Sequence, residues 1–338
     1  MQARPRGARL HDCVRDIMFF ALALFHCPSF LPLPYVQPVF RPPAEADSLI
    51  LQVTVGCSWN KCSFCDMYTQ PQQSYRQKPL EEIASDLRLA SELASAYGAP
   101  VRRVFLADGD AMGQPTARLR SILELIRESL PTVSRVSSYC LPRNVRSKSV
   151  EDLASLCALG LRTLYVGCES GDDEVLRCVQ KGETRESSVE ALRKLQAAGL
   201  RTSVMILHGL GGRALSAQHV RGSAQLILEA PPHYLSTLVV SFPLGLDRHA
   251  SGFEAAGHGP FEPLSPSELL GEQRGLLEAL EGLVPPMGSR GTIFRSDHAS
   301  NYLPLKGNLP RDRGRLLDEL SAAQRGEVRL RPEWARGL

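Results

Sequence analysis

The sequence predicts an α/β protein: a partial, open parallel βα barrel of about six units with a C-terminal α+β extension. Apolar, β-branched runs alternate with amphipathic helical stretches from residue 45 onward, as in a parallel sheet covered by helices. Six such runs precede residue 248, fewer than the eight of a complete barrel. A doubly wound open sheet has the same periodicity and remains the alternative.

Six segments have the length and the residue content of strands. They are residues 49–55, 101–107, 133–139, 161–167, 201–207 and 235–241. Polar or glycine-rich residues follow the strands in turn. In a barrel of parallel strands the carboxyl ends share one mouth, so we expect these residues to gather there.

The helical stretches between the strands have recognisable ends. Pro79 suits a first helical position, and Gly98 stops that helix. Ser149 is followed three residues later by Asp152, which predicts a helix N-terminus with a capping box. Thr184 is expected to cap another helix.

We expect three parts along the chain. Residues 1–44 form an N-terminal extension that is poorly ordered, residues 45–248 the partial barrel, and residues 249–338 a C-terminal extension that packs on the barrel. Residues 17–25 are a continuous apolar run, far shorter than the ~20 residues that span a bilayer. The small-residue cleavage pattern of a signal peptide is missing after this run.

The alternation of strand-like and helical segments ends near Pro260. Residues 269–283 predict a helix, residues 292–295 an extended segment and residues 311–324 a final helix.

Composition excludes some partners and indicates a compartment. The net charge of +3 is nearly balanced for 338 residues, so nothing points to nucleic acid, whose binders carry a pronounced basic face. Nine cysteines, an odd number without a disulfide-like spacing, indicate a reducing compartment. We therefore expect a cytoplasmic protein without a membrane partner.

Three cysteines lie within nine residues, directly after the first predicted strand. Cys57, Cys62 and Cys65 have C-x4-C-x2-C spacing, so their thiolates can converge on one metal centre. A structural zinc usually takes four protein ligands in paired units, and no second pair occurs here. A plant-type ferredoxin adds a distant fourth cysteine, and the next one along this chain is Cys140. The third interpretation is a cluster with three protein ligands and one open iron.

The surroundings of the cysteine loop favour a catalytic site. Asp108-Gly109-Asp110 follows the second strand, Glu169-Ser170 the fourth and a glycine-rich turn beginning at His208 the fifth. These segments share the predicted mouth with the cysteines, which a simple electron carrier does not require.

The cysteine loop, with Phe64 before the third cysteine, resembles the signature of the radical S-adenosylmethionine (SAM) superfamily. Residues 165–184 resemble the Gly-x-Glu-Ser-Gly segment of its coproporphyrinogen-oxidase-like and methylthiotransferase-like branches. Residues 298–307 resemble the tail of uncharacterised coproporphyrinogen-oxidase-like members. Two departures occur: the commoner spacing is C-x3-C-x2-C, and the usual Gly-Gly-Glu after the second strand is Asp-Gly-Asp here.

The resemblance implies two cofactors, a 4Fe–4S cluster held by the three cysteines and SAM on the fourth iron. It implies that Asp108, Gly109 and Asp110 contact the methionine amine, and that Phe64 lies near the adenine. It places Glu169, with Ser170 beside it, at the ribose or the methionine end. The cluster would cleave SAM reductively, and the 5′-deoxyadenosyl radical would take hydrogen from a small-molecule substrate.

The resemblance also implies a low-potential electron donor such as flavodoxin or ferredoxin, and it names neither the substrate nor a catalytic side chain. Two non-catalytic alternatives stay open: an Fe–S electron carrier or redox sensor, and a structural zinc protein. Simpler roles compete at single positions as well. Asp-Gly-Asp is a good turn sequence, and Glu169 would serve as a helix cap near Asp172.

Overall fold

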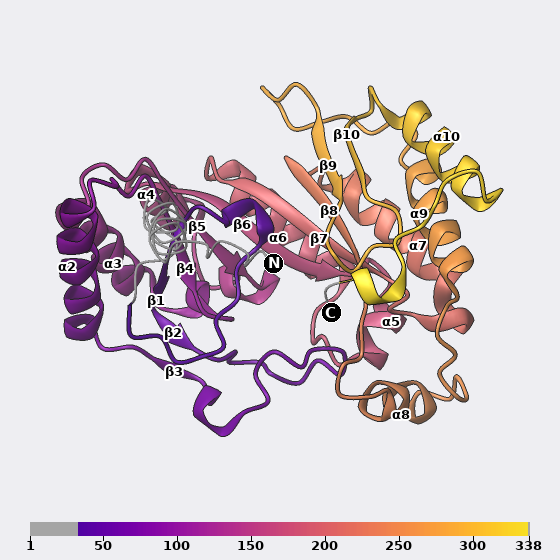
Figure 1. Cartoon of the computed structure of the whole chain (residues 1–338), viewed down its shortest axis with the longest axis horizontal. Helices are drawn as coiled ribbons and strands as arrows, with labels where there is room; N and C mark the ends of the chain where they lie inside the picture. The colour runs from indigo at the N-terminus through magenta and orange to yellow at the C-terminus, as the bar shows by residue number, and fades with distance from the viewer. Residues whose placement is uncertain (1–32, 337–338) are drawn as a thin grey trace, which may run out of the picture.

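The structure is a computed structural model that describes residues 33–336 (Figure 1). Its centre is one sheet of eight strands in the order β1-β4-β5-β6-β7-β8-β9-β10. The strands are β1 (Leu49–Gln52), β4 (Arg103–Ala107), β5 (Arg135–Cys140), β6 (Leu161–Glu169), β7 (Arg201–His208), β8 (Tyr234–Val239), β9 (Thr292–Ser296) and β10 (Leu305–Leu309). Neighbouring strands are parallel except for the last pair, β9 and β10. The sheet does not close, so the predicted open barrel is confirmed.

All six predicted strands are present, and one of them is divided. The segment predicted at residues 49–55 contains β1 and then β2 (Thr54–Val55), which pairs in antiparallel fashion with β3 (Arg76–Gln77). The chain therefore leaves the main sheet just before the cysteine loop.

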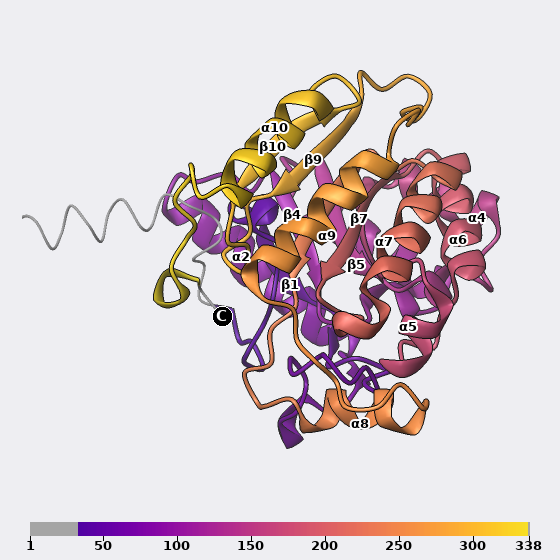
Figure 2. The same cartoon turned by 90° about the vertical axis from the view of Figure 1, so that its right-hand side faces the viewer.

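Most of the helices cover the outer face of the sheet, and α8 lies apart from them (Figures 1 and 2). The helices are α2 (Leu80–Ala96), α3 (Thr116–Ser129), α4 (Val150–Ala158), α5 (Asp173–Cys178), α6 (Arg185–Ala197), α7 (Gly212–Glu229), α8 (Asp247–Ala255), α9 (Pro266–Ala279) and α10 (Arg313–Gln324). Short 3-10 turns lie at Pro43–Glu45, Pro71–Gln73, Ala111–Gly113, Pro142–Val145 and Glu333–Ala335. Figure 1 has α2 and α3 at one end of the sheet and α9 and α10 at the other. None of the helices within residues 33–336 has the length and apolar character that crossing a bilayer requires.

Local signals fix several helix ends as predicted. The Ser149 hydroxyl accepts a hydrogen bond from the Asp152 N–H at 3.1 Å, which completes the capping box of α4. Thr184 caps α6 through the N–H of Ser187 at 3.1 Å. Pro79 lies one residue earlier than expected and precedes the first residue of α2.

The two faces of the sheet have different side chains because neighbouring residues of a strand point in opposite directions. Leu49 and Leu51 pack into the large apolar core that also holds helix residues. Ile50 belongs instead to a smaller cluster with Phe105 and Tyr165. Aromatic side chains thus occupy the other face of the sheet.

The C-terminal part contains more strand than the sequence indicated. The extended segment predicted at residues 292–295 is β9, and it joins the main sheet by pairing with β8. Strand β10 and helix α8 were not predicted. The helix predicted at residues 269–283 is α9, which begins earlier because Ser265 caps it and Pro266 takes its first position.

Residues 33–44, which the sequence assigned to the N-terminal extension, pack against β1. The Tyr35 hydroxyl donates a hydrogen bond to the Ile50 carbonyl at 2.9 Å. The Val36 N–H donates to Gln52 Oε1 at 2.9 Å, and Leu33 is buried. The rest of the predicted extension, residues 1–32, lies outside the described residues.

Candidate functional site

The cysteine loop begins at a turn that requires glycine. Gly56 follows β2 with a φ of +70°, and a Cβ atom there would lie 2.0 Å from the Gln73 carbonyl oxygen. An L side chain is strained at such a φ and has no space here. The turn directs the chain away from the sheet edge into Cys57.

Helix α8 contacts the cysteine loop from the C-terminal part of the chain. Arg248 donates hydrogen bonds to the carbonyl oxygens of Cys62 and Cys65, the latter at 2.9 Å. The neighbouring His249 has its Nδ1 3.1 Å from the Ser63 hydroxyl. Hydrogen bonds from α8 therefore hold the segment between the second and third cysteines.

A second set of contacts joins the loop to residues 179–182 after α5. The Ser63 N–H donates to the Val179 carbonyl at 3.0 Å, and the Trp59 indole N–H donates to the Gln180 carbonyl at 2.8 Å. The Arg143 guanidinium stacks on the Trp59 ring, 3.8 Å from its centroid. The loop is thus fixed between helix α8 and the segment that follows α5, both of which are distant from it in sequence.

The three thiols influence one another. Burial raises the pKa of the Cys62 thiol, and it raises the pKa of the Cys65 thiol to about 11. Repulsion from Cys57 contributes to both shifts, so the three sulfurs lie within electrostatic reach of each other. Metal binding must therefore release protons from these groups.

The spacing of the three sulfurs bears on the kind of metal centre. Two groups of ligand atoms within residues 33–336 converge to within 4.8 Å, and the three cysteines are in neither. One tetrahedral zinc needs thiolate sulfurs about 3.8 Å apart, given Zn–S bonds of about 2.3 Å. The remaining described cysteines, Cys140, Cys157, Cys168 and Cys178, are buried outside this loop.

Asp108 is buried at the end of β4, and both its oxygens accept hydrogen bonds. The Tyr68 hydroxyl donates to Oδ1 at 2.6 Å, and the Gln52 amide donates to Oδ2 at 3.4 Å. Desolvation by burial raises the pKa of the Asp108 carboxyl to about 6, although these hydrogen bonds oppose the shift. The Tyr68 ring also covers Gly109, where a Cβ atom would lie 2.4 Å from it.

Asp110 connects the cysteine loop to the turn after β5. Its carboxylate accepts hydrogen bonds from the Ser58 hydroxyl, next to the first cysteine, and from the Asn144 amide, the latter at 2.6 Å. Burial raises the pKa of the Asp110 carboxyl. Asp-Gly-Asp is therefore more than a surface turn, since both carboxylates are buried and hydrogen-bonded.

Glu169 lies at the end of β6 with a φ of +65° and forms a buried ion pair. The Lys181 ammonium donates to Glu169 Oε1 at 2.9 Å and lies 5.8 Å from the centroid of the Phe64 ring. Burial would lower the pKa of Lys181, yet Glu169 and the Cys62 thiol raise it overall. The helix cap considered for Glu169 is supplied instead by Asp172, whose Oδ1 accepts the Val175 N–H at 3.0 Å.

Ser170 points into a different set of contacts. Its hydroxyl lies 2.8 Å from His219 Nδ1 of α7 and accepts the Asp172 N–H at 3.0 Å. Both partners belong to the protein interior between β6 and α7. The structure therefore brings together the three cysteines, Phe64, the Asp-Gly-Asp segment and Glu169, whereas the Ser170 hydroxyl bonds to α7.

Several residues of this site gave no clear signal in the sequence. Lys181 was visible only as part of the 165–184 segment, without a role. Tyr68, Arg248 and His249 carried no motif, because their contacts depend on how distant segments pack. The sequence gives no signal for these three residues apart from the groups that they contact in the folded protein.

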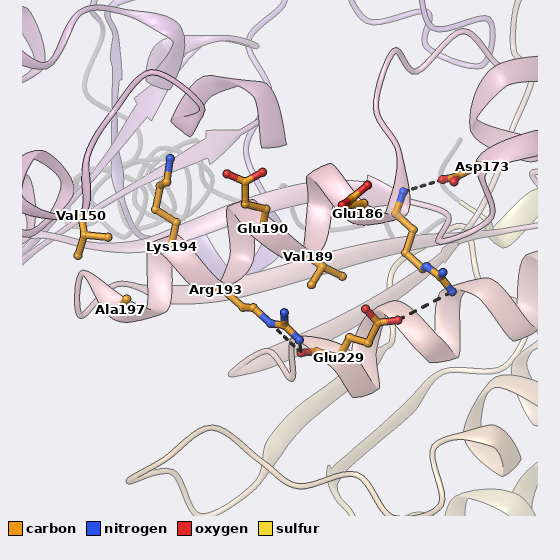
Figure 3. Close-up of a pocket in the computed structure, with 10 residues that line it drawn as sticks. Val150, Asp173, Glu186, Val189, Glu190, Arg193, Lys194, Ala197 and Glu229 are labelled. Atoms are coloured by element: carbon orange, nitrogen blue, oxygen red, sulfur yellow. Dashed lines mark hydrogen bonds and ion pairs between the residues drawn. The ribbon is translucent and has the colours of Figure 1, made fainter.

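A surface hollow lies elsewhere, along the outer side of α6. It is lined by charged side chains that include Glu186, Glu190 and Arg193, and by Glu229 at the end of α7 (Figure 3). Arg193 donates to the Glu229 carbonyl oxygen at 2.9 Å. None of the predicted site residues lines this hollow, so it is not the candidate site.

Comparison with known proteins supports the assignment made from the residues. The radical SAM superfamily matches residues 51–216. The chain is 26% identical over 166 residues to 4′-phospho-dehydrooxetanocin synthase of Priestia megaterium, covering 45% of this chain and 22% of that protein. It is 20% identical over 182 residues to the heme chaperone HemW of Bacillus subtilis, covering 53% of this chain and 47% of that protein.

Among solved structures, the chain is similar to coproporphyrinogen III oxidase (HemN) of Escherichia coli, described as a radical SAM enzyme. The TM-score is 0.49 at 18% identity, covering 70% of this chain and 52% of that one. The chain thus spans between about a fifth and a half of the length of these relatives. The match covers residues 51–216, which include the cysteine loop, so this part of the chain is a radical SAM domain, and the cofactors of that superfamily are a 4Fe–4S cluster and SAM.

Proposed function

We propose that this protein cleaves SAM reductively, with Cys57, Cys62 and Cys65 as the three protein ligands of the cluster. The observation that carries the proposal is one loop with three thiols that hydrogen bonds hold from two sides and that Ser58 joins to the carboxylate of Asp110 at a strand end. Three thiolates leave one iron open, as an iron that binds a cofactor must be. The three sulfurs do not all lie within 4.8 Å of one another, whereas the thiolates on one tetrahedral zinc lie about 3.8 Å apart.

When bound, a reduced cluster would supply one electron to the sulfonium of SAM, and cleavage of the bond to the 5′ carbon would give methionine and a 5′-deoxyadenosyl radical able to take hydrogen from the substrate. The protein supplies orientation and shielding. Arg248 and His249 hold the loop from one side, and Trp59 anchors it to residues 179–182 from the other.

We assign the methionine amine to Asp108, Gly109 and Asp110. A carboxylate offers about four lone-pair positions, so Asp110 keeps acceptor capacity beyond its hydrogen bonds from Ser58 and Asn144. Asp108 already accepts from Tyr68, from Gln52 and from the backbone of Gly56 and Gly109, so we give the larger part of the contact to Asp110. Phe64 offers a ring face to the adenine, and its neighbour Lys181 shares its charge between Glu169 and the cluster loop. Glu169 remains the proposed contact of the ribose or the methionine end, with Ser170 supporting it through the backbone.

We propose a small-molecule substrate and a low-potential donor such as flavodoxin or ferredoxin, in the cytoplasm. Aromatic side chains lie on the barrel face of the sheet, where Tyr35 and Val39 of the segment before β1 pack against them. Phe105 and Tyr139 lie with ring centroids 5.0 Å apart, and Tyr165 lies 6.1 Å from Phe105. Porphyrinogen decarboxylation, suggested by one relative, has little support because a tetra-anionic substrate requires a cluster of basic residues.

Anaerobic reconstitution of the full chain tests this proposal. We expect about four irons per chain, the content of one 4Fe–4S cluster, and release of 5′-deoxyadenosine from SAM under a strong reductant. Cys57→Ala, Cys62→Ala and Cys65→Ala should each lose the cluster and the product. Cys157→Ala, which changes a buried cysteine on α4, is the matched control and should keep both.

Other outcomes would point to the alternatives. Iron uptake with SAM left intact favours an electron carrier or sensor. Zinc retained by the cysteine loop favours a structural metal site. Iron content that is unaltered in all three cysteine variants would refute the ligand assignment.

A further inference from the structure

A group of buried ligand atoms lies behind the candidate site, between the end of β7 and the helices α7 and α9. His208, His219 and Glu272 each offer one ligand atom, and these atoms all lie within 4.8 Å of one another. All three residues are at most 3% exposed. Figure 2 shows α7 and α9 side by side over the sheet, and the two helices contribute His219 and Glu272.

Several side-chain atoms of this group lack hydrogen-bond partners. Ten buried side-chain nitrogen or oxygen atoms in the described part of the chain are unpaired, and four of them belong to this group: His208 Nδ1 and Nε2, His219 Nε2 and Glu272 Oε1. Each buried, unpaired polar group costs about 1–3 kcal/mol. Four such atoms in one place indicate that a bound species, one that accepts lone pairs from nitrogen and oxygen, satisfies them in the protein.

Charge points to a cation as the occupant. Glu272 is buried, and no lysine or arginine within residues 33–336 lies within ion-pair distance of its carboxylate. A buried carboxylate without a counter-charge is unfavourable by several kcal/mol. A water molecule would fill some of the hydrogen-bonding positions without adding charge. A proton on His208, whose Nδ1 lies 3.5 Å from Glu272 Oε2, would compensate the charge but would leave His219 Nε2 and Glu272 Oε1 unpaired.

The spacing of the ligand atoms fits a single divalent ion. His208 Nδ1 and Glu272 Oε2 are 3.5 Å apart, too long for a good hydrogen bond. Two ligand atoms on one tetrahedral Zn²⁺ lie about 3.3 Å apart, given metal–ligand bonds of about 2.0–2.1 Å. Two imidazoles and one carboxylate are a ligand set that zinc accepts in proteins.

Neighbouring groups orient two of the three ligands. His219 Nδ1 lies 2.8 Å from the Ser170 hydroxyl, which leaves Nε2 for the metal. The Gly209 N–H donates to Glu272 Oε2 at 2.7 Å. Protein metal sites usually hold their ligands through such outer contacts.

A second group of three possible ligands is already hydrogen-bonded within the protein. Glu174, Cys178 and His258 also converge, but the Glu174 carboxylate accepts hydrogen bonds from Arg177 and from His258. None of its nitrogen or oxygen atoms is among the unpaired ones. The two groups therefore differ in whether the protein already satisfies them.

We propose that His208, His219 and Glu272 bind one Zn²⁺ ion, a structural metal site that is separate from the cysteine loop and joins α9 of the C-terminal part to the barrel. A water molecule or the second oxygen of Glu272 completes the coordination. Since Ser170 follows Glu169 directly, the zinc site also braces the end of β6.

Metal analysis of the full-length protein tests this proposal. The chain with Cys57→Ala, Cys62→Ala and Cys65→Ala together, dialysed after purification, should keep about one Zn²⁺ per chain although its iron is lost. Adding His219→Asn or Glu272→Gln should lower the retained zinc at least tenfold. His233→Asn, a half-buried histidine that accepts the Thr202 N–H, is the control and should leave the zinc unchanged.

Cobalt substitution in the protein with the three cysteine changes keeps the test valid if the buried variants fail to fold. Bound Co²⁺ should show the visible bands of a tetrahedral site without a thiolate charge-transfer band. The proposal is overturned if dialysed protein retains neither Zn²⁺ nor Co²⁺, or if His219→Asn binds either metal as the unaltered site does. A failure of SAM cleavage would not affect this result, because the zinc is measured without the cysteine ligands.

Discussion

At the scale of single residues, the chemistry of the site depends on charges that the fold buries. Asp108, Asp110 and Glu169 are carboxylates at the ends of strands, and each has at least one hydrogen-bonding partner from another segment. Burial raises the pKa of the two aspartates. Their protonation therefore influences stability as well as cofactor binding.

Asp108 should make the stability of the protein depend on pH. Its folded pKa of about 6 lies above the ordinary value of about 3.9, so the folded protein binds a proton that the unfolded chain releases between these values. The stabilising effect of that proton is complete below pH ~4 and is lost as the pH rises through ~6. The free energy of unfolding should therefore decrease over this window.

Asp108→Asn removes this dependence, because an amide stays neutral and still accepts the Tyr68 hydrogen bond. We expect the free energy of unfolding of the variant, relative to that of the unaltered protein, to be about 1 kcal/mol higher at pH 7.5 than at pH 5. Urea unfolding at the two pH values measures this difference. The new amide nitrogen faces Gln52, but that cost does not change with pH. Asp318→Asn, at an exposed position on α10, is the control, and equal differences at both pH values would contradict the prediction.

At the scale of secondary-structure elements, local signals predicted the helix ends but not what the helices contact. The capping boxes at Ser149 and Thr184 were predicted because they involve residues three apart in sequence. Helix α8 was missed, although it carries Arg248 and His249 to the cysteine loop. Its nine residues include one glycine, Gly252, and a single large apolar side chain, Phe253, so little in the sequence marks a helix there.

Arg248→Ala should loosen the cluster without unfolding the protein. The side chain is 46% exposed, and it donates to two carbonyl oxygens of the cysteine loop. Loss of these charge-assisted hydrogen bonds costs about 1–3 kcal/mol, which corresponds to cluster release that is roughly 5- to 150-fold faster. Decay of the cluster absorbance in the presence of an iron chelator measures this rate.

Arg274→Ala is the matched control, since this arginine pairs with Glu278 on the exposed side of α9. It should release the cluster at the rate of the unaltered protein. Equal rates for Arg248→Ala and the unaltered protein would mean that α8 does not hold the loop.

At the scale of the whole molecule, the segment before β1 joins strands that lie side by side only in the folded sheet. Glu45 is fully buried and accepts hydrogen bonds from Ser48, Arg135 and Tyr165. Arg135 begins β5 and Tyr165 lies in β6. The carboxylate of Glu45 thus connects the segment before β1 to strands β5 and β6 in the middle of the sheet.

Glu45→Gln should destabilise the fold by about 2–4 kcal/mol. It removes the negative charge that Arg135 faces, and the new amide N–H group would lie against groups that themselves donate hydrogen bonds. The urea midpoint should decrease, with little change in the slope of the transition. Glu128→Gln on the exposed side of α3 should leave the midpoint unchanged. An unchanged midpoint in Glu45→Gln would show that the network adds no stability.

The sequence by itself determined the alternation of strands and helices, the open parallel sheet and the three thiols that follow its first strand. These features depend on short-range spacing: periodicity within a segment, a cap within one turn, three cysteines within nine residues. They required no knowledge of which distant segments meet.

Only the tertiary structure decided the rest. It paired β9 with β8, gave Glu169 its Lys181 partner and assembled His208, His219 and Glu272 from one strand and two helices. The physical reason is that burial and charge pairing between distant segments follow from sheet order and helix packing. Neither leaves a periodic signal in the chain.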